Sequence, residues 1–235
     1  MTNGPQDTLG SFKNSYGVLV PFLNAWTDKI RERCKSDDQK RAGFYIWGRY
    51  SLSMPTLERI AEPRFAPDIY IIARSCLEYF ACLRAVITTP ALTRDFWAFM
   101  DKSKVYYACR LEELGCTEEL AELEPGLEEA FGDEWRKKGA SKWCVVSDMI
   151  KTHGGPDERL LYALLSNLTH CSVIAPSVLE RSTPADVNLP QILSGVYGGY
   201  LIATKEFLDF IWGSVWTSDG EECRKHFVNV MESWV

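Results

Sequence analysis

The stretch DIYIIARSCLEYFACLRAVI (68–87) decides the fold of this 235-residue chain. Its apolar side chains cover nearly the whole circumference of a helix, which is typical of a helix buried in the middle of a bundle. Pro67 precedes the stretch and suits a first helical turn, where Asp68 lies beside the positive end of the helix dipole. We therefore expect a central helix over 68–88.

Helical periodicity extends in both directions from this segment. Upstream, Pro21 predicts that the regular part of the first helix begins near Val20. Pro55 predicts a kink or a break in the second helix. The helices expected in addition to the central one cover 16–33, 39–60, 93–114, 142–152, 156–171, 192–215 and 221–234, with a loop over 177–190. Neither strand alternation nor a long repeat occurs, so the sequence predicts a single all-α domain over 1–235, a bundle of about seven or eight helices with no sheet.

Composition and charge exclude several classes of protein. With 46% hydrophobic and 25% charged residues, the chain is not a disordered or low-complexity protein. A net charge of −6 excludes a basic footprint over the whole surface. No apolar run is long enough for a membrane helix, so no membrane partner is expected. The eight cysteines are scattered without a CxxC motif, which favours free thiols and a cytoplasmic location.

One segment differs from the rest in charge. The stretch 111–135 contains ten acidic residues and no basic one, and Arg136, Lys137, Lys138 and Lys142 follow it closely. A solvated acidic helix with a basic end explains this pattern, and so does a lobe that binds a partner. Both interpretations stay open at this stage.

The central helix carries two opposite charges on one face. Arg74 and Glu78 are four residues apart, and Ala81 and Ala85 continue the same face. If that face is exposed, the pair contributes only a few tenths of a kcal/mol. If it is packed, the two charges need partners, because an unpaired buried charge is costly.

A second polar face follows near residue 160. Arg159, Tyr162, Ser166 and His170 recur at spacings of three and four, while leucines occupy the other sides of that helix. Histidine is the side chain that titrates near neutral pH without help, so His170 is the candidate general acid or base. A carboxylate such as Glu78 would orient it. A face that simply meets water explains the pattern equally well.

Most familiar site motifs are missing from the sequence. It contains no HExxH, no ExxH pair, no phosphate-binding glycine motif and no GxSxG elbow, so we expect no metal and no other cofactor. A basic cluster could contact phosphate or could be a solvated helix end. It comprises Arg31, Arg33, Lys35, Lys40 and Arg41, with Trp26 and Tyr45 nearby.

Two spaced motifs resemble a bacterial family of helical proteins called domain of unknown function 5677. The stretch 68–87 is similar to the family's helix with an aliphatic run, R-x-x-x-E and an aromatic residue, and SKWCVVSDMIKTHGGPDERLLYALLSNLTHCS (141–172) is similar to its second signature. The matching positions of that second signature are Trp143, Tyr162, Leu165, Ser166 and His170. The resemblance covers about 39–215 and implies a helical bundle with Arg74, Glu78, Ser166 and His170 in one polar pocket.

Bundles of this kind also resemble the HEPN superfamily, which includes RNA-cleaving toxins and anti-phage effectors. Those proteins carry an arginine four to six residues before a histidine on one helix. Here Arg159 precedes His170 by eleven positions, so the arginine would come from another helix, with Arg74 as the candidate.

Three hypotheses for the function follow. In the first, the protein cleaves RNA as a toxin or defence effector: His170 is the general acid or base, Arg74 binds phosphate, and Glu78 orients His170. Ser166 completes this catalytic set as a hydrogen-bond donor, and Tyr162 and Arg159 bind the substrate. In the second, the cluster is structural and the chain binds another protein chain as a non-catalytic interaction or sensor protein. Self-association is left open. In the third, an apolar pocket binds a small molecule and is lined by Tyr45, Trp47, Tyr50, Phe96 and Trp97.

Overall fold

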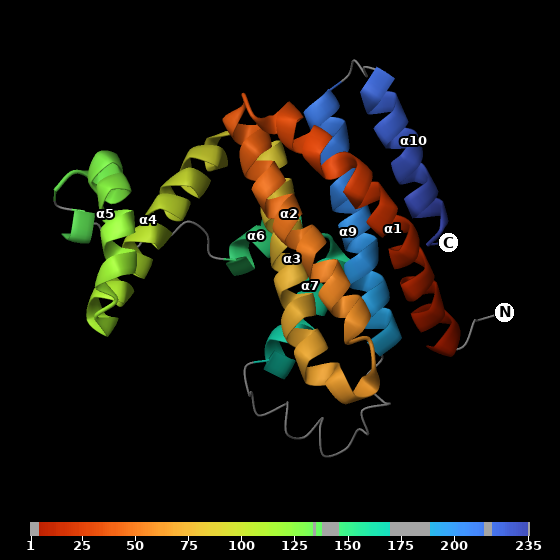
Figure 1. The fold of residues 1–235 in the computed structure, drawn as a ribbon. Coiled ribbons are helices and arrows are strands. Elements are labelled where there is room, and N and C mark those ends of the chain that lie inside the picture. The colour runs from red at the N-terminus through yellow and green to blue at the C-terminus, as the bar shows by residue number, and fades with distance from the viewer. Residues whose placement is uncertain (1–4, 134, 138–145, 170–188, 214–217, 235) are drawn as a thin grey trace. The chain divides into compact units, whose positions relative to one another are not determined.

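A computed structural model describes residues 5–133, 135–137, 146–169, 189–213 and 218–234. Its helices are α1 (Pro5–Cys34), α2 (Asp38–Arg59), α3 (Ala66–Thr88), α4 (Ala91–Leu114), α5 (Thr117–Phe131), α6 (Val146–His153), α7 (Pro156–Thr169), α9 (Leu189–Trp212) and α10 (Ser218–Glu232), with 3₁₀ turns η1 (Pro63–Phe65) and η2 (Trp135–Lys137) (Figure 1). No strand occurs in these ranges, so the predicted all-α class is confirmed.

The chain divides into two compact units. The first combines Met1–Thr88 with Val146–Val235, and the second is Thr89–Val145. The acidic stretch 111–135 belongs to the second unit. Whether the whole chain behaves as one domain stays a prediction, and each unit is described by itself below.

In the first unit, α1, α2, α3 and α9 pack side by side as a bundle. Helix α10 packs on α1 and α9, while α6 and α7 pack on α3 (Figure 1). Helix α3 therefore contacts α2, α6, α7 and α9, which explains why its sequence is apolar nearly all round. Its buried side chains include Leu77, Phe80 and Leu83.

Side chains near the start of α2 cap the ends of two neighbouring helices. The Gln39 amide donates to the carbonyls of Val86 and Ile87, at 2.7 and 3.2 Å, near the end of α3. The Lys40 ammonium donates to the carbonyl of Ile211, at 3.0 Å, near the end of α9. These three bonds satisfy carbonyls that have no partner within their own helix. They fix the axial positions of α3 and α9 against α2.

Polar contacts inside the bundle add specificity to the apolar packing. The Trp47 indole N–H donates to the Thr204 hydroxyl at 3.1 Å, and the hydroxyls of Ser51 and Tyr200 lie 2.9 Å apart. All four residues are buried, so each of these bonds avoids the cost of an unpaired polar group. They tie α2 to α9.

Two prolines lie inside continuous helices, which corrects the prediction for α1. Helix α1 runs through Pro21 and already includes Pro5, so the expected start near Val20 is wrong. Proline removes the hydrogen bond to the carbonyl four residues earlier, and here that residue is Gly17. Both Pro21 and Gly17 are exposed, so water can replace the lost bond. Helix α2 likewise continues through Pro55 to Arg59 without a break.

The start of α9 also differs from the expected loop over 177–190. Leu189 and Pro190 already belong to the helix, and proline is favoured in a first turn, where no hydrogen bond is lost. Residues 177–188 lie outside the described residues, as do residues 142–145 of the expected helix over 142–152.

The second unit is a helical hairpin with its own small core. Val105 and Ala108 of α4, Leu127 of α5 and Trp135 of η2 are buried against one another. Gly115 joins α4 to α5 with φ +72°, a left-handed conformation that glycine adopts without strain.

Arg136 of η2 contacts both helices of the hairpin in the second unit. Its guanidinium carbon lies 4.2 Å from the centre of the Trp135 ring, and its side chain pairs with Glu112 and Glu124. These contacts connect η2 to α4 and α5, and they neutralise two of the ten acidic residues in 111–135.

Candidate functional site

Three polar side chains meet where α7 packs on α3. Arg74 Nη2 lies 3.4 Å from Glu78 Oε1 and donates to the Tyr162 hydroxyl, also at 3.4 Å. The Tyr162 hydroxyl in turn donates to Glu78 Oε1 at 3.3 Å. The three groups therefore form a closed triangle, which we call the α3–α7 polar cluster.

The α3–α7 polar cluster is partly shielded from solvent. The side chains of Arg74 and Glu78 are 25% and 27% exposed. The Arg74 guanidinium carbon lies 5.5 Å from the centre of the Tyr162 ring, a cation–π distance. The Nε atom of Arg74 is buried and has no hydrogen-bond partner among the described residues. Thus Nη2 of the guanidinium is paired, while the Nε donor has no acceptor among the described residues.

The other residues proposed for this site are placed less completely. The Ser166 hydroxyl is buried one turn after Tyr162, so this face of α7 turns inward. His170 and Trp143 lie outside the described residues. Arg159 is exposed, and its Nε donates to the Gly154 carbonyl at 3.1 Å, so it ties α7 to the α6–α7 connection. The chemical roles of all these side chains stay predictions.

A second junction on α3 was missed by the sequence analysis. Arg84 Nε lies 2.8 Å from Glu206 Oε2 of α9, and Arg84 Nη1 donates to the His153 carbonyl at the end of α6 at 2.9 Å. Its guanidinium carbon lies 5.3 Å from the centre of the Phe80 ring. Burial, and then the charge of Arg84, lowers the pKa of His153. No local spacing in the sequence indicates this junction, because Arg84 and Glu206 are far apart along the chain.

The basic cluster near the end of α1 is largely neutralised. Arg31 pairs with Asp28 at 2.7 Å, and Lys35 pairs with Glu32 at 2.6 Å. Arg41 pairs with Asp38 at 2.8 Å, and Lys40 caps α9. These contacts favour a solvated helix end over a phosphate site.

The aromatic residues suggested for a small-molecule pocket are mostly core side chains. Trp47 and Tyr50 are buried in the first unit, and Phe96 is buried in the second. Tyr45 is exposed. A groove of about 470 Å³ between α1 and α2 does include Trp47, together with Val20, Leu23, Leu52 and Pro55.

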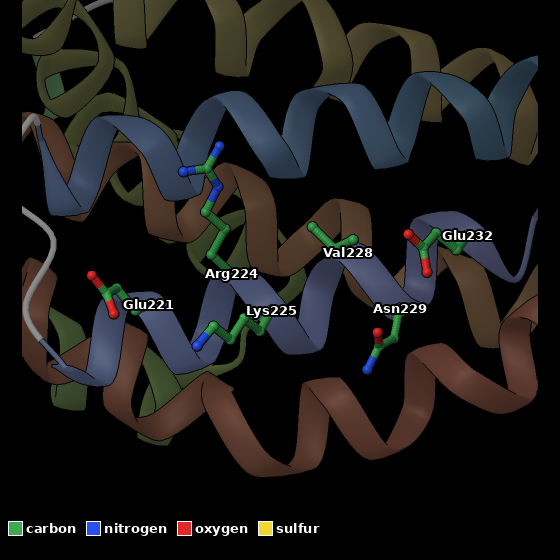
Figure 2. A pocket seen from close by; sticks show the side chains of 6 residues that line it. All are labelled: Glu221, Arg224, Lys225, Val228, Asn229 and Glu232. Atoms are coloured by element: carbon green, nitrogen blue, oxygen red, sulfur yellow. The ribbon is translucent and has the colours of Figure 1, made fainter.

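Another hollow, of about 610 Å³, lies on α10. Its lining side chains, shown in Figure 2, are Glu221, Arg224, Lys225, Val228, Asn229 and Glu232. All six come from one helix and are exposed. The hollow is therefore a surface feature, without groups that converge from several elements as in an active site.

Neither a metal cluster nor a reactive buried thiol is found in the part of the chain that the structure describes. No group of three histidine, cysteine, aspartate or glutamate side chains could hold an ion there. Cys34, Cys76 and Cys223 are buried, and burial raises the pKa of each thiol to about 12. These three thiols are therefore poor nucleophiles near neutral pH.

Comparisons with known proteins add no relative. No family model matches the chain, and no curated protein or solved structure shows significant similarity to it. The resemblance inferred from the two motifs stays a prediction. None of the helices within the described ranges is both long and apolar enough to cross a membrane.

Proposed function

We propose that this protein is a non-catalytic interaction protein in which the α3–α7 polar cluster holds the first unit together. One observation carries the proposal: Arg74, Glu78 and Tyr162 are joined to one another by an ion pair and two hydrogen bonds. A guanidinium that already contacts a carboxylate is a weak anion binder, because the adjacent negative charge repels the ligand. The neutralised basic cluster near the end of α1 points the same way.

The second unit is the proposed partner-binding element. Its exposed acidic side chains without an ion pair among the described residues are Glu118, Glu119, Glu122, Glu128, Glu129 and Asp133. Tyr106, Tyr107 and Leu114 of α4 are more than half exposed. Exposed tyrosines are typical of protein interfaces, and unpaired carboxylates attract basic groups. The partner would be a protein chain with a basic, partly apolar surface.

Charge-neutralised full-length variants test this proposal. We expect the triple variant Glu118→Gln, Glu122→Gln, Glu129→Gln to lose a partner that the wild-type protein captures reversibly from cell extract. The matched control is Asp68→Asn, Glu221→Gln, Glu232→Gln, which changes the net charge equally on exposed sites of the first unit. The control should retain the partner. Equal capture by both variants, identified by mass spectrometry, would contradict the proposal.

RNA cleavage is the second candidate, and one observation favours it. The Nε–H of Arg74 is buried without an acceptor among the described residues, and it could donate to a phosphate oxygen if substrate binding uncovers it. In that mechanism the 2′-hydroxyl oxygen attacks the adjacent phosphorus and the bond to the 5′-oxygen breaks. His170 would remove the proton from the 2′-hydroxyl and return it to the leaving oxygen.

Incubation of the purified protein and its His170→Ala variant with total RNA separates the two candidates. Cleavage by the wild-type protein alone would favour catalysis. If both proteins leave RNA intact, or both act alike, His170 has no catalytic role in RNA cleavage.

A further inference from the structure

Specific side-chain contacts attach the last described helix, α10, to α1. Phe227 packs against Phe22, with ring centres 5.1 Å apart. The Ser15 hydroxyl donates to the carbonyl of Ser233 at 2.7 Å. One turn beyond Phe22 on α1, the Trp26 indole N–H donates to Nδ1 of His226 at 3.0 Å.

The Trp26–His226 bond fixes the protonation state of the imidazole. An indole N–H is a donor only, so Nδ1 of His226 must be the acceptor and carries no proton. The Trp26 side chain is buried, and the Phe22 ring stands edge-on to the imidazole at 5.5 Å. A proton on Nδ1 would place two donors against each other and leave the indole N–H without its acceptor.

The charged groups around His226 do not offer the imidazolium a defined partner. From α1, the Lys29 ammonium lies 4.4 Å from the centre of the Trp26 ring. On α10, Lys225 is adjacent in sequence, and Glu222 precedes His226 by one turn and is exposed. Lys205 and Asp209 of α9 line a hollow with Arg224 of α10 instead, and they pair with each other at 2.8 Å. Within the described ranges, His226 takes part in no salt bridge that would repay the lost hydrogen bond.

The geometry points to His226 as a proton-sensitive latch that holds α10 on α1. While Nδ1 is unprotonated, Trp26 donates to it and α10 is docked. When the imidazole takes up a second proton, the bond breaks and α10 loosens from α1. Imidazole is the side chain that takes up such a proton on acidification, so acid is the signal that tests the latch. This inference is independent of the proposed function.

Hydrogen exchange in the full-length protein tests the latch. After correction for intrinsic rates, protection of amides in Ser218–Glu232 should fall about tenfold between pH 7.5 and pH 5.5, as expected when one hydrogen bond is lost and its donor stays unpaired. Amides of α2 and α3 should keep their protection. Unchanged protection of α10 in the wild-type protein would overturn the proposal.

Two variants make the test specific to His226. In His226→Asn the amide oxygen lies near the position of Nδ1 and accepts without titrating, so α10 should stay protected at both pH values. His153→Gln, a change on α6, is the matched control, and the protection of α10 should fall in it on acidification as in the wild-type protein. If α10 in His226→Asn loosens on acidification as much as in the wild-type protein, the latch is refuted.

Nuclear magnetic resonance of the wild-type imidazole supplies a readout that does not depend on either variant folding. At pH 7.5 the proton should be on Nε2. The midpoint at which Nδ1 gains a proton should coincide with the midpoint of α10 exposure. Separate midpoints, or a proton on Nδ1 at pH 7.5, would overturn the proposal.

Discussion

Arg74 and Arg84 lie on the same helix and are similarly shielded, yet they make different contacts. Arg74 pairs at 3.4 Å with a glutamate of its own helix and at 3.4 Å with a tyrosine of α7. Arg84 pairs at 2.8 Å with Glu206 of α9 and at 2.9 Å with a backbone carbonyl of α6. Shorter charge-assisted bonds are stronger, so Arg84 should contribute more to stability.

This difference shows where the first unit is tied together. Arg84 joins three helices, α3, α6 and α9, through one guanidinium. Arg74 joins only α3 and α7, and part of its pairing stays within α3. A pair within one helix can form without tertiary packing and contributes a few tenths of a kcal/mol. The junction at Arg84, in contrast, can form only in the folded bundle.

The largest expected effect is that of Arg84→Met. The variant loses the ion pair with Glu206 and the bond to the His153 carbonyl, while the Met side chain keeps part of the packing on Phe80. We expect a loss of about 2 kcal/mol in the free energy of unfolding, because two bonds from a charged donor are removed. For a protein of this length the melting temperature should fall by about 6 °C, measured by circular dichroism.

Arg84→Lys is the control for that prediction. The ammonium keeps the charge but is a compact donor that does not reproduce the planar fork of a guanidinium. It should recover only part of the loss. Stability equal to wild type in Arg84→Met would mean that the junction at Arg84 adds nothing to the first unit.

A smaller effect is expected for Arg74→Met. The variant removes two long bonds and a cation–π contact, so we expect a loss of about 1 kcal/mol. It also removes the buried Nε donor, which offsets part of that loss. Urea unfolding measures the difference. A loss larger than that of Arg84→Met would reverse the ranking of the two arginines.

The sequence singled out the residues of the α3–α7 polar cluster but not those of the junction at Arg84. Arg74 and Glu78 are four residues apart, and Tyr162 recurs at helical spacing with Ser166, so local periodicity was enough to single out all three. That Tyr162 meets Arg74 depends on which face of α7 packs on α3, and leucines on several sides of α7 left this undetermined. Periodicity therefore identified candidates but not their partners.

Arg84 and Glu206 could not be predicted, for a physical reason. They lie on α3 and α9, and no spacing rule relates residues on helices that are distant in sequence. The predicted start of α1 was wrong for a different reason. Pro21 costs a helix little where the freed carbonyl of Gly17 meets water, and exposure of that carbonyl is decided by tertiary packing.

Tyr162→Phe should have a still smaller effect, and it tests the α3–α7 polar cluster alone. The ring and its cation–π contact with Arg74 stay, while the hydroxyl that bridges Arg74 and Glu78 is lost. Because those bonds are 3.3–3.4 Å long, we expect a loss of about 0.5 kcal/mol in the free energy of unfolding. Leu161→Met, a conservative change one residue away, serves as the control and should be nearly neutral. A loss above that of Arg74→Met would make Tyr162 the centre of the cluster.

The smallest expected effect is a pH dependence at the Arg84 junction. Burial first, and Arg84 second, lowers the pKa of His153 in the folded protein. As pH falls below about 6.5, the ordinary pKa of histidine, the unfolded chain binds a proton at this position more readily than the folded one. The free energy of unfolding therefore falls, and the loss is complete below the lowered pKa.

His153→Gln should remove this contribution and flatten the decline in melting temperature between pH 7.5 and pH 5.5. In the Arg84→Met background the same substitution should flatten the decline less, because burial still lowers the pKa of His153 but the repelling charge is gone. The comparison uses four proteins: the wild type, His153→Gln, Arg84→Met and the double variant. His226 and His170 are present in all of them, so any contribution from these two residues cancels. Equal flattening in both backgrounds would show that burial alone sets the pKa of His153, and that Arg84 acts only through its bonds to Glu206 and the end of α6.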